Sequence, residues 1–448
     1  MTAAVYRGVV LLLWVVAVYS AVSCRGLFWD GASFLVNILD LGGFHDFYTA
    51  RAHVDWVTQA PVIAAAWLGV RDLHLLSIVY SFGLFALPVG LYHLALARAR
   101  HDPVMLAIVI VILATVYLPT SFFIVGEYNA AFAAVTAAMV IALTGRRRSD
   151  AVLLCFLGLL CLRSYEALVY LGPLLAACIL WSMRGQRDPA KRLLLAVAAL
   201  AFVGAAIVSA VTIVDYWSHP HFAKVRSMSL EFWQNLQFSV PLAGLLICAV
   251  IGLVRPEMLR GRLPIAIIAI TSAALLLTPW YRLLSDYSIL YPPSHYLARQ
   301  AAGLVLAGLL VCLWVHVAWR NAPPRVLTVL SETGVARRLV ASTFVLFAAA
   351  TIPDVALTRL WTGYLDRLAA LVDRGDGIIP TRMLPLAEWP DKLFAQDWSL
   401  PALSAVVSRT PGRAYVIADK DYLSNPPFDP SCGTLPRLAG YQWGRGLP

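Results

Sequence analysis

The chain has 448 residues, of which 60% are hydrophobic and 13% are charged, and its mean hydropathy is +0.74. In soluble domains about a quarter of residues are charged, so this composition excludes an ordinary soluble protein and predicts an all-α polytopic membrane protein. The formal net charge of +10 is explained by basic loops facing anionic lipid and calls for no nucleic-acid partner.

Apolar segments recur along the chain at lengths near the ~20 residues that a helix needs to cross a bilayer. We expect about eleven transmembrane helices, of which the first resembles an uncleaved signal anchor. The expected spans are residues 6–23, 74–96, 103–122, 129–144, 151–162, 167–183, 193–214, 237–254, 264–280, 300–319 and 339–353.

Basic residues are unevenly divided between the loops on the two sides of these spans. Seventeen of the 35 Lys and Arg residues fall on the side of the N-terminus, eight fall in the short loops of the other side, and ten fall in the C-terminal tail. The positive-inside rule then predicts a cytoplasmic N-terminus and an extracytoplasmic tail, in what we expect to be a bacterial inner membrane.

The stretch 28–61, directly after the first span, organises the rest of the chain. Asp30 is its strongest candidate for an active-site residue. A carboxylate where a first helix leaves the bilayer must stay hydrated, pair with a cation or take part in a reaction. Residues 32–41 predict an interfacial helix that ends at glycines, and residues 60–70 predict a short apolar helix begun by Pro61. The apolar side of the first helix is expected to hold Phe34, Leu35, Ile38, Leu39 and Leu41.

The pair of segments 151–162 and 167–183 is joined only by residues 163–166. Twelve helical residues cover about 18 Å, so Arg163 and Glu166 are expected below the outer membrane surface, in the wall of a cavity. An ion pair between these two residues is the simpler alternative.

The outer loop 280–299 mixes aromatic residues with both signs of charge. The aromatic residues, Tyr296 among them, are typical of the belt at a membrane surface. The cationic groups of Arg282, His295 and Arg299 are instead suited to hold a phosphate or pyrophosphate.

Metal and cysteine signals are weak. His219 and His221 flank a proline, yet no matching Cys or carboxylate spacing accompanies them, so we expect no metal site from this motif, although a divalent cofactor stays open. Five cysteines lie in apolar segments, and only Cys24 and Cys432 are placed for an oxidising compartment.

From residue 354 the composition changes, and we expect a domain boundary between 353 and 354. Apolar residues spaced through 357–372 predict an amphipathic helix, and residues 414–418 predict a short buried strand. A small α/β domain over residues 354–448 is the resulting expectation.

The order of these features resembles the GT-C superfamily of membrane glycosyltransferases, in the style of protein O-mannosyltransferases and lipid A aminoarabinose transferases. The resemblance implies that Asp30 is the catalytic or acceptor-contacting carboxylate and that Glu127, in Gly126-Glu-Tyr-Asn129, is a second acidic site residue. The family's basic residue and Pro-Pro element corresponds here to Gln59-Ala-Pro61, which departs from that pattern. Further candidates for substrate binding in the first loop are His45, Asp46, Asp55 and Gln59.

The predicted function is therefore transfer of a sugar from a polyprenyl-phosphate donor to a lipid, glycan or protein acceptor at the outer membrane face. The phosphate leaving group needs no general acid, only a base for the acceptor hydroxyl and cations for the departing phosphate. Asp30 is the expected base, and Arg163, Arg282, His295 and Arg299 are the expected cations. Two alternatives stay open: a transporter or flippase of lipid-linked saccharides, and an accessory subunit in which Asp30 only pairs with Arg25 or Arg51.

Overall fold

The computed structural model describes residues 2–45, 51–218, 229–277, 293–380, 394–395, 399–409, 414–417, 438 and 440–441. The α-helices up to residue 216 are α1 (Thr2–Val22), α2 (Asp30–Leu41), α3 (Ala52–Trp67), α4 (Leu73–Ala99), α5 (Pro103–Ile112), α6 (Tyr128–Thr144), α7 (Arg148–Leu162), α8 (Leu168–Ser182) and α9 (Pro189–Tyr216). The later α-helices are α11 (Leu236–Val254), α12 (Leu263–Leu277), α13 (Pro293–Ala318), α14 (Arg325–Ser331), α15 (Thr333–Arg374) and α16 (Leu400–Val407).

Short helical turns and two strands complete these elements. The turns are η1 (Arg25–Leu27), the π-helical η3 (Leu113–Tyr117), η4 (Leu118–Thr120), η5 (Ser229–Gln234) and η6 (Pro256–Arg260). The strands are β1 (Gly377–Pro380) and β2 (Ala414–Ile417).

Within the described residues, each of the expected apolar spans falls largely on helical segments, which identifies the chain as an integral membrane protein. Seven helical segments of the described chain are long and apolar enough to cross a bilayer, and α6, α8 and α12 are shorter apolar helices. The 21 residues of α1 give a length of about 31 Å, which matches the ~30 Å of hydrocarbon in a membrane.

The centre of the bundle is formed by α5, η3 and α6, in which nearly every residue is buried. The alanine-rich sequence of α6 allows this, because small side chains let neighbouring helices approach closely. Around this centre, α4 packs on α1, α3 and α6, α9 packs on α7 and α8, and α15 packs on α1, α5 and α12.

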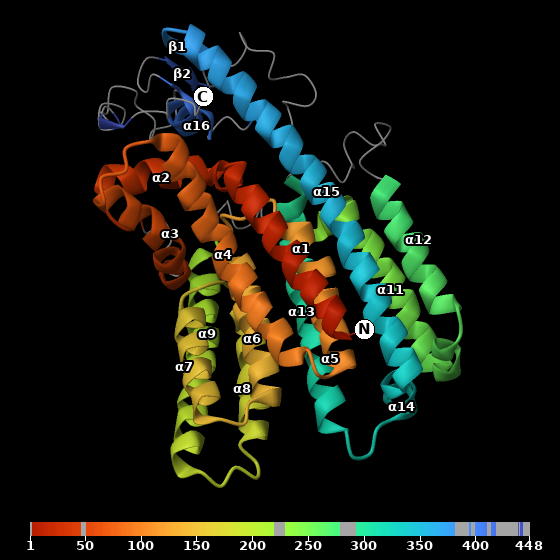
Figure 1. The fold of residues 1–448 in the computed structure, drawn as a ribbon. Helices are drawn as coiled ribbons and strands as arrows, with labels where there is room; N and C mark the ends of the chain where they lie inside the picture. Colours follow the sequence, from red (N-terminus) through yellow and green to blue (C-terminus); the bar gives the residue numbers. More distant parts are fainter. Residues whose placement is uncertain are drawn as a thin grey trace.

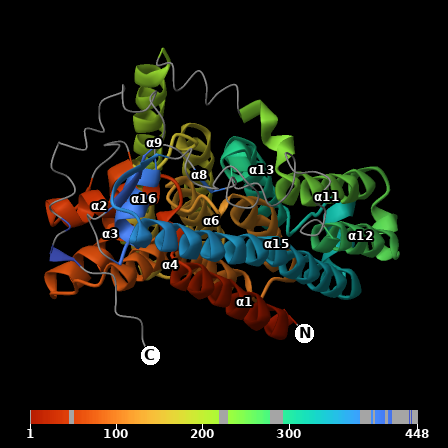
Figure 2. The same ribbon diagram turned by 90° about the horizontal axis from the view of Figure 1, so that it is seen from above.

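The two ends of the bundle differ in what covers them (Figure 1). At the upper end lie α2, α3, α16 and the strands, while at the lower end lie the N-terminus, α14 and the arginine-rich turns. Seen from above, α15 crosses the molecule and α16 lies beside α2 (Figure 2). The apolar side of α2 is as expected for Phe34, Leu35, Ile38 and Leu39, which are buried, but Leu41 is exposed.

The expectation that Pro61 begins a helix is wrong. Helix α3 begins nine residues earlier, at Ala52, and Pro61 lies inside it. Tertiary contacts hold the helix through this position: α3 packs on α4, and the buried Gln59 amide bonds both the backbone nitrogen and the backbone oxygen of His45, at 2.9 and 2.8 Å. A proline inside a helix is tolerated where neighbouring elements supply such contacts.

Helix α15 is longer than expected, because it joins the last predicted span to the predicted amphipathic helix without a break. Its 42 residues reach about 63 Å, and the boundary expected between residues 353 and 354 falls inside it. The predicted apolar pattern is present in its second half, where Leu357, Trp361, Tyr364, Leu365, Leu368 and Val372 are buried.

The predicted strand at residue 414 is present and pairs in parallel with β1, from Gly377 opposite Ala414 to Pro380 opposite Ile417. Helix α16 lies between the two strands in the sequence and packs on β2, where the Ser404 hydroxyl accepts a hydrogen bond from the Val416 nitrogen at 3.1 Å. These elements follow a β-α-β order.

Candidate active site

Asp30 begins α2 at a tight turn that leaves α1. The preceding residue, Trp29, has φ 57° and ψ −122°, and only it and Cys24 have positive φ among the non-glycine residues that the structure describes. A Cβ on Gly31 would lie 1.7 Å from the Gly26 oxygen, so glycine is required there. Backbone strain of this kind costs about 1–3 kcal/mol and is typical of functional sites.

The neighbouring side chains Phe28 and Trp29 pack against two different sets of aromatic rings. The Phe28 ring meets Phe122 at 5.0 Å and Trp361 of α15 at 5.7 Å between centroids. The Trp29 ring meets Phe123 at 4.8 Å and Tyr296 of α13 at 5.5 Å. The turn that carries Asp30 is therefore fixed against both the central loop and the two late helices.

The Gly126-Glu-Tyr-Asn129 sequence builds the loop that carries Glu127. The Tyr128 hydroxyl donates to the Thr120 oxygen at 2.9 Å, and the Asn129 amide donates to the Phe123 oxygen at 3.1 Å. A Cβ on Gly126 would lie 2.2 Å from the Tyr128 ring. Side chains of the motif thus hold the backbone of the turn that precedes it and fix Glu127, which is 5% exposed.

Arg51 joins two carboxylates from different parts of the chain. Its guanidinium lies 2.9 Å from Glu127 and 2.7 Å from Glu166, and 5.7 Å from the centre of the Tyr165 ring. Arg163 does not pair with Glu166, so that expectation is wrong: Arg163 is exposed, and its carbonyl accepts a hydrogen bond from the His53 nitrogen at 3.3 Å. Of the two residues expected in a cavity wall, Arg163 is exposed and Glu166 is partly buried, with 21% of its side chain exposed.

The two carboxyl groups that share Arg51 have pKa values shifted in opposite directions. Burial raises the pKa of Glu127 above its usual value, and the charge of Arg51 only partly opposes this. Burial also acts on Glu166, but the charge and hydrogen bonds of Arg51 outweigh it and lower that pKa. Carboxyl groups whose environments move their pKa values apart are common in active sites.

Arg299 is a buried cation of a different kind. It is 8% exposed, and its guanidinium lies 3.4 Å from the centre of the Tyr296 ring. Within the described parts of the chain it makes no hydrogen bond and no ion pair. The Tyr296 ring also meets that of Phe123 at 5.2 Å, so Arg299 lies beside the loop that carries Glu127.

Three carboxylates converge near this group. Asp30 directly follows Trp29, whose ring lies 5.5 Å from that of Tyr296, and Glu127 pairs with Arg51 at 2.9 Å. Asp55 is 5% exposed and lines, with Glu127, a small cavity with room for about one water molecule. The sequence-predicted Asp30, Asp55, Glu127, Tyr296 and Arg299 therefore lie in one part of the structure.

Other predicted residues have different surroundings. Gln59 is 2% exposed and holds the His45 backbone. His295 is fully buried, and its Nδ1 accepts a hydrogen bond from the Phe122 nitrogen at 3.3 Å. Asp46 and Arg282 lie outside the described residues, as do His219, His221 and Cys432.

Sequence reasoning did not select Arg51, Tyr165 and Trp29 for the site. The available signal was position, because Arg51 and Trp29 flank the acidic first loop and Tyr165 lies between two short spans. It also did not select the buried pair of Arg25 and Asp354, whose side chains meet at 2.7 Å and are 0% and 1% exposed. Among the residues described, no group of three or more His, Cys, Asp or Glu side chains is placed to hold a metal ion.

Comparisons of the chain with models of protein families, with curated proteins and with solved structures found no match.

Proposed function

We propose that the protein is a GT-C-type glycosyltransferase that moves a sugar from a polyprenyl-phosphate donor to an acceptor hydroxyl at the upper end of the bundle. The observation that carries this proposal is Arg299, a cation that is 8% exposed, stacks on the Tyr296 ring and makes no ion pair with a described residue. Burying a charge without a partner is costly, so such a site favours an anionic ligand. A guanidinium is well suited to a phosphate.

The acidic residues around this cation supply the other half of the chemistry. The acceptor oxygen attacks the anomeric carbon, the bond between that carbon and the donor phosphate oxygen breaks, and the phosphate leaves as an anion beside Arg299. Asp30 takes the proton of the acceptor hydroxyl. The two ion pairs of Arg51, with Glu127 and with Glu166, connect the loops around the site.

Transport of lipid-linked saccharides is less well supported. A transport path needs polar groups through the bilayer centre. In the central helices, the hydroxyls of Thr115 and Thr136 donate to carbonyls of their own helix turns, those of Val111 and Phe132, both at 2.7 Å. The charged groups of the described site lie at the upper end instead.

The accessory-subunit alternative needs Asp30 to neutralise Arg25 or Arg51. Arg25 has Asp354 as its counterion, and Arg51 has Glu127 and Glu166. The described ion pairs of both arginines are therefore made with other carboxylates, and the accessory-subunit alternative is less well supported.

The arginine-rich lower end supports a cytoplasmic N-terminus. We further propose about eleven spans, an extracytoplasmic C-terminal α/β domain and location in a bacterial inner membrane. An alkaline phosphatase fusion after Pro448 should be active, and a cytoplasmic reporter at the same position should be inactive. The reverse result contradicts this orientation.

Donor binding by the purified protein tests the function. Arg299→Ala should weaken binding of a polyprenyl-phosphate sugar about ten- to a hundredfold, the ~1.5–3 kcal/mol of a charge-assisted contact, and Arg299→Lys should restore it only partly. Arg71→Ala is the matched control, because Arg71 also lies over a tyrosine ring, at 5.1 Å from that of Tyr441, but is exposed. Equal affinities in wild type and Arg299→Ala, or equal losses in both alanine variants, contradict the proposal.

A further inference from the structure

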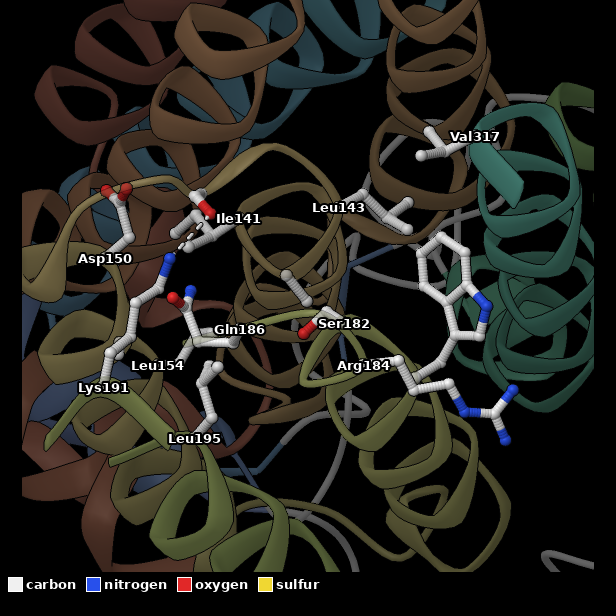
Figure 3. A pocket seen from close by; sticks show the side chains of 14 residues that line it. Ile141, Leu143, Asp150, Leu154, Ser182, Arg184, Gln186, Lys191, Leu195 and Val317 are labelled. Carbon is white, nitrogen blue, oxygen red and sulfur yellow. Dashed lines mark hydrogen bonds between the residues drawn. The ribbon is translucent and has the colours of Figure 1, made fainter. Parts of the chain in front are cut away.

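A second polar pocket, drawn in Figure 3, lies at the lower end of the bundle. Arg299 lies near the start of α13, whereas Val317 of the pocket lining lies near its end. Its volume is about 320 Å³, within the range typical of small-molecule sites. It lies where α6 ends, α7 and α9 begin, and α8 and α13 end. Its polar lining residues are Asp150, Ser182, Arg184, Gln186 and Lys191.

Lys191 is the unusual residue of this pocket. It is 6% exposed, although lysine is almost never buried without a counterion. Its ammonium group donates to the Gly145 oxygen at 3.3 Å, and this is its only hydrogen bond within the described chain. An ammonium has three donors, so two remain for a ligand.

The one carboxylate in the pocket lining is already engaged. Asp150 lies 2.7 Å from the Arg98 guanidinium, and it accepts a hydrogen bond from the Arg147 nitrogen at 2.9 Å at the start of α7. It therefore has a counterion other than Lys191, and the pocket keeps an uncompensated positive charge. Figure 3 shows Lys191 and Gln186 side by side, while the Arg184 guanidinium points away from them.

We propose that this pocket binds a phosphate group, with the Lys191 ammonium as its counterion and the Gln186 amide as a second donor. The phosphate of an anionic membrane lipid fits best, because the pocket lies between helix ends on the arginine-rich face, where basic pockets meet lipid head groups. A soluble phosphate compound has the same chemistry and is distinguished by the test. This site is independent of the proposed sugar transfer.

The test is a binding titration of the purified full-length protein in detergent, with dioctanoyl phosphatidic acid, dioctanoyl phosphatidylcholine and inorganic phosphate as separate probes. Wild type should bind phosphatidic acid at least tenfold more tightly than phosphatidylcholine. Lys191→Gln should lose at least tenfold in affinity for phosphatidic acid, and Lys191→Arg should keep most of it. Arg192→Gln removes the same charge from the next residue of α9, which is exposed and outside the pocket lining, and should bind as wild type does.

Each probe and variant gives a decisive outcome. Inorganic phosphate that binds as tightly as phosphatidic acid, with the same dependence on Lys191, supports a phosphate site for a soluble compound. Equal losses in Lys191→Gln and Arg192→Gln, with both variants eluting as wild type in size-exclusion chromatography, overturn the proposal in favour of general charge attraction. No preference of the wild type for either phosphate probe over phosphatidylcholine also overturns it.

Discussion

At the lower end of the bundle, Asp102 and Asp188 begin helices and pair with basic side chains near water, whereas at the upper end Glu127 and Asp354 are buried and pair across the fold. Asp102 and Asp188 each cap a helix with two backbone hydrogen bonds, and Asp188 lies 2.6 Å from the exposed Arg148. Glu127 and Asp354 cap nothing with their side chains, and their arginines come from distant parts of the sequence. Not every acidic residue follows this division: Asp72 at the upper end caps α4, and Asp150 at the lower end is buried.

Charges at the lower end therefore stabilise helix ends, whereas charges at the upper end are buried at a cost in desolvation free energy. A cap with an exposed ion pair satisfies backbone donors at little desolvation cost. A buried pair costs several kcal/mol per ion before its attraction is counted. The upper end carries two such arrangements and one cation without a described counterion, which is the pattern of a binding site and not of a stabilising surface.

The largest effect is expected from breaking the Arg25–Asp354 pair. Asp354→Asn leaves the Arg25 charge fully buried, although Ser20, Thr358 and the Ser121 oxygen still accept from it. We expect a loss of about 3–5 kcal/mol in unfolding free energy, measured by thermal or denaturant unfolding in detergent.

The matched control lies at the lower end. Glu332→Gln removes a partner of Arg260, in a pair whose side chains are 38% and 49% exposed, and should cost less than about 1 kcal/mol. Losses of similar size in the two variants would contradict the comparison of the two ends. The double variant Arg25→Met with Asp354→Leu should recover much of the stability, because an apolar pair removes the buried charge.

The next effect concerns catalysis. Asp30→Asn keeps the shape of the side chain but removes the base, so the rate of sugar transfer should fall ~10²-fold or more. Asp40→Asn, an acid at the other end of α2, should leave the rate within about twofold of wild type. Transfer near the wild-type rate in Asp30→Asn, with donor binding intact, would assign the base to another carboxylate such as Glu127.

The fold was largely predictable from local pattern, and the site only in part. Apolar length located the helices of the bundle, and Glu166, expected in a cavity wall, is partly buried. The course of α3 through Pro61 could not be predicted, because it depends on contacts with α4 and on the bonds between Gln59 and His45. The partners of Arg51 could not be predicted either, since one lies 76 and the other 115 positions away.

The smallest effect tests the lower end and depends on pH. Asp102 is 22% exposed at its side chain, where it meets His316 and Arg320. Burial raises its pKa, but hydrogen bonds from His316 and the Met105 nitrogen, with the charges of His316 and Arg320, bring it down to about 2 from the ordinary 3.8. A lowered carboxyl pKa stabilises the fold above the ordinary value, and this stabilisation is lost as pH falls toward the folded-state value.

Asp102→Asn should therefore lower the unfolding free energy by about 1–2 kcal/mol at pH 5, a figure reduced for partial exposure to solvent. The difference in unfolding free energy between wild type and variant should shrink at pH 3, where this carboxyl group is already protonated in most unfolded molecules. It should nearly vanish near pH 2. Asp215→Asn, at an exposed position near the end of α9, should change stability by less than about 0.5 kcal/mol at either pH. Thermal unfolding of the three proteins at pH 5 and pH 3 measures this, and a deficit of Asp102→Asn that grows as the pH falls contradicts the assignment of Asp102 as an ionised helix cap.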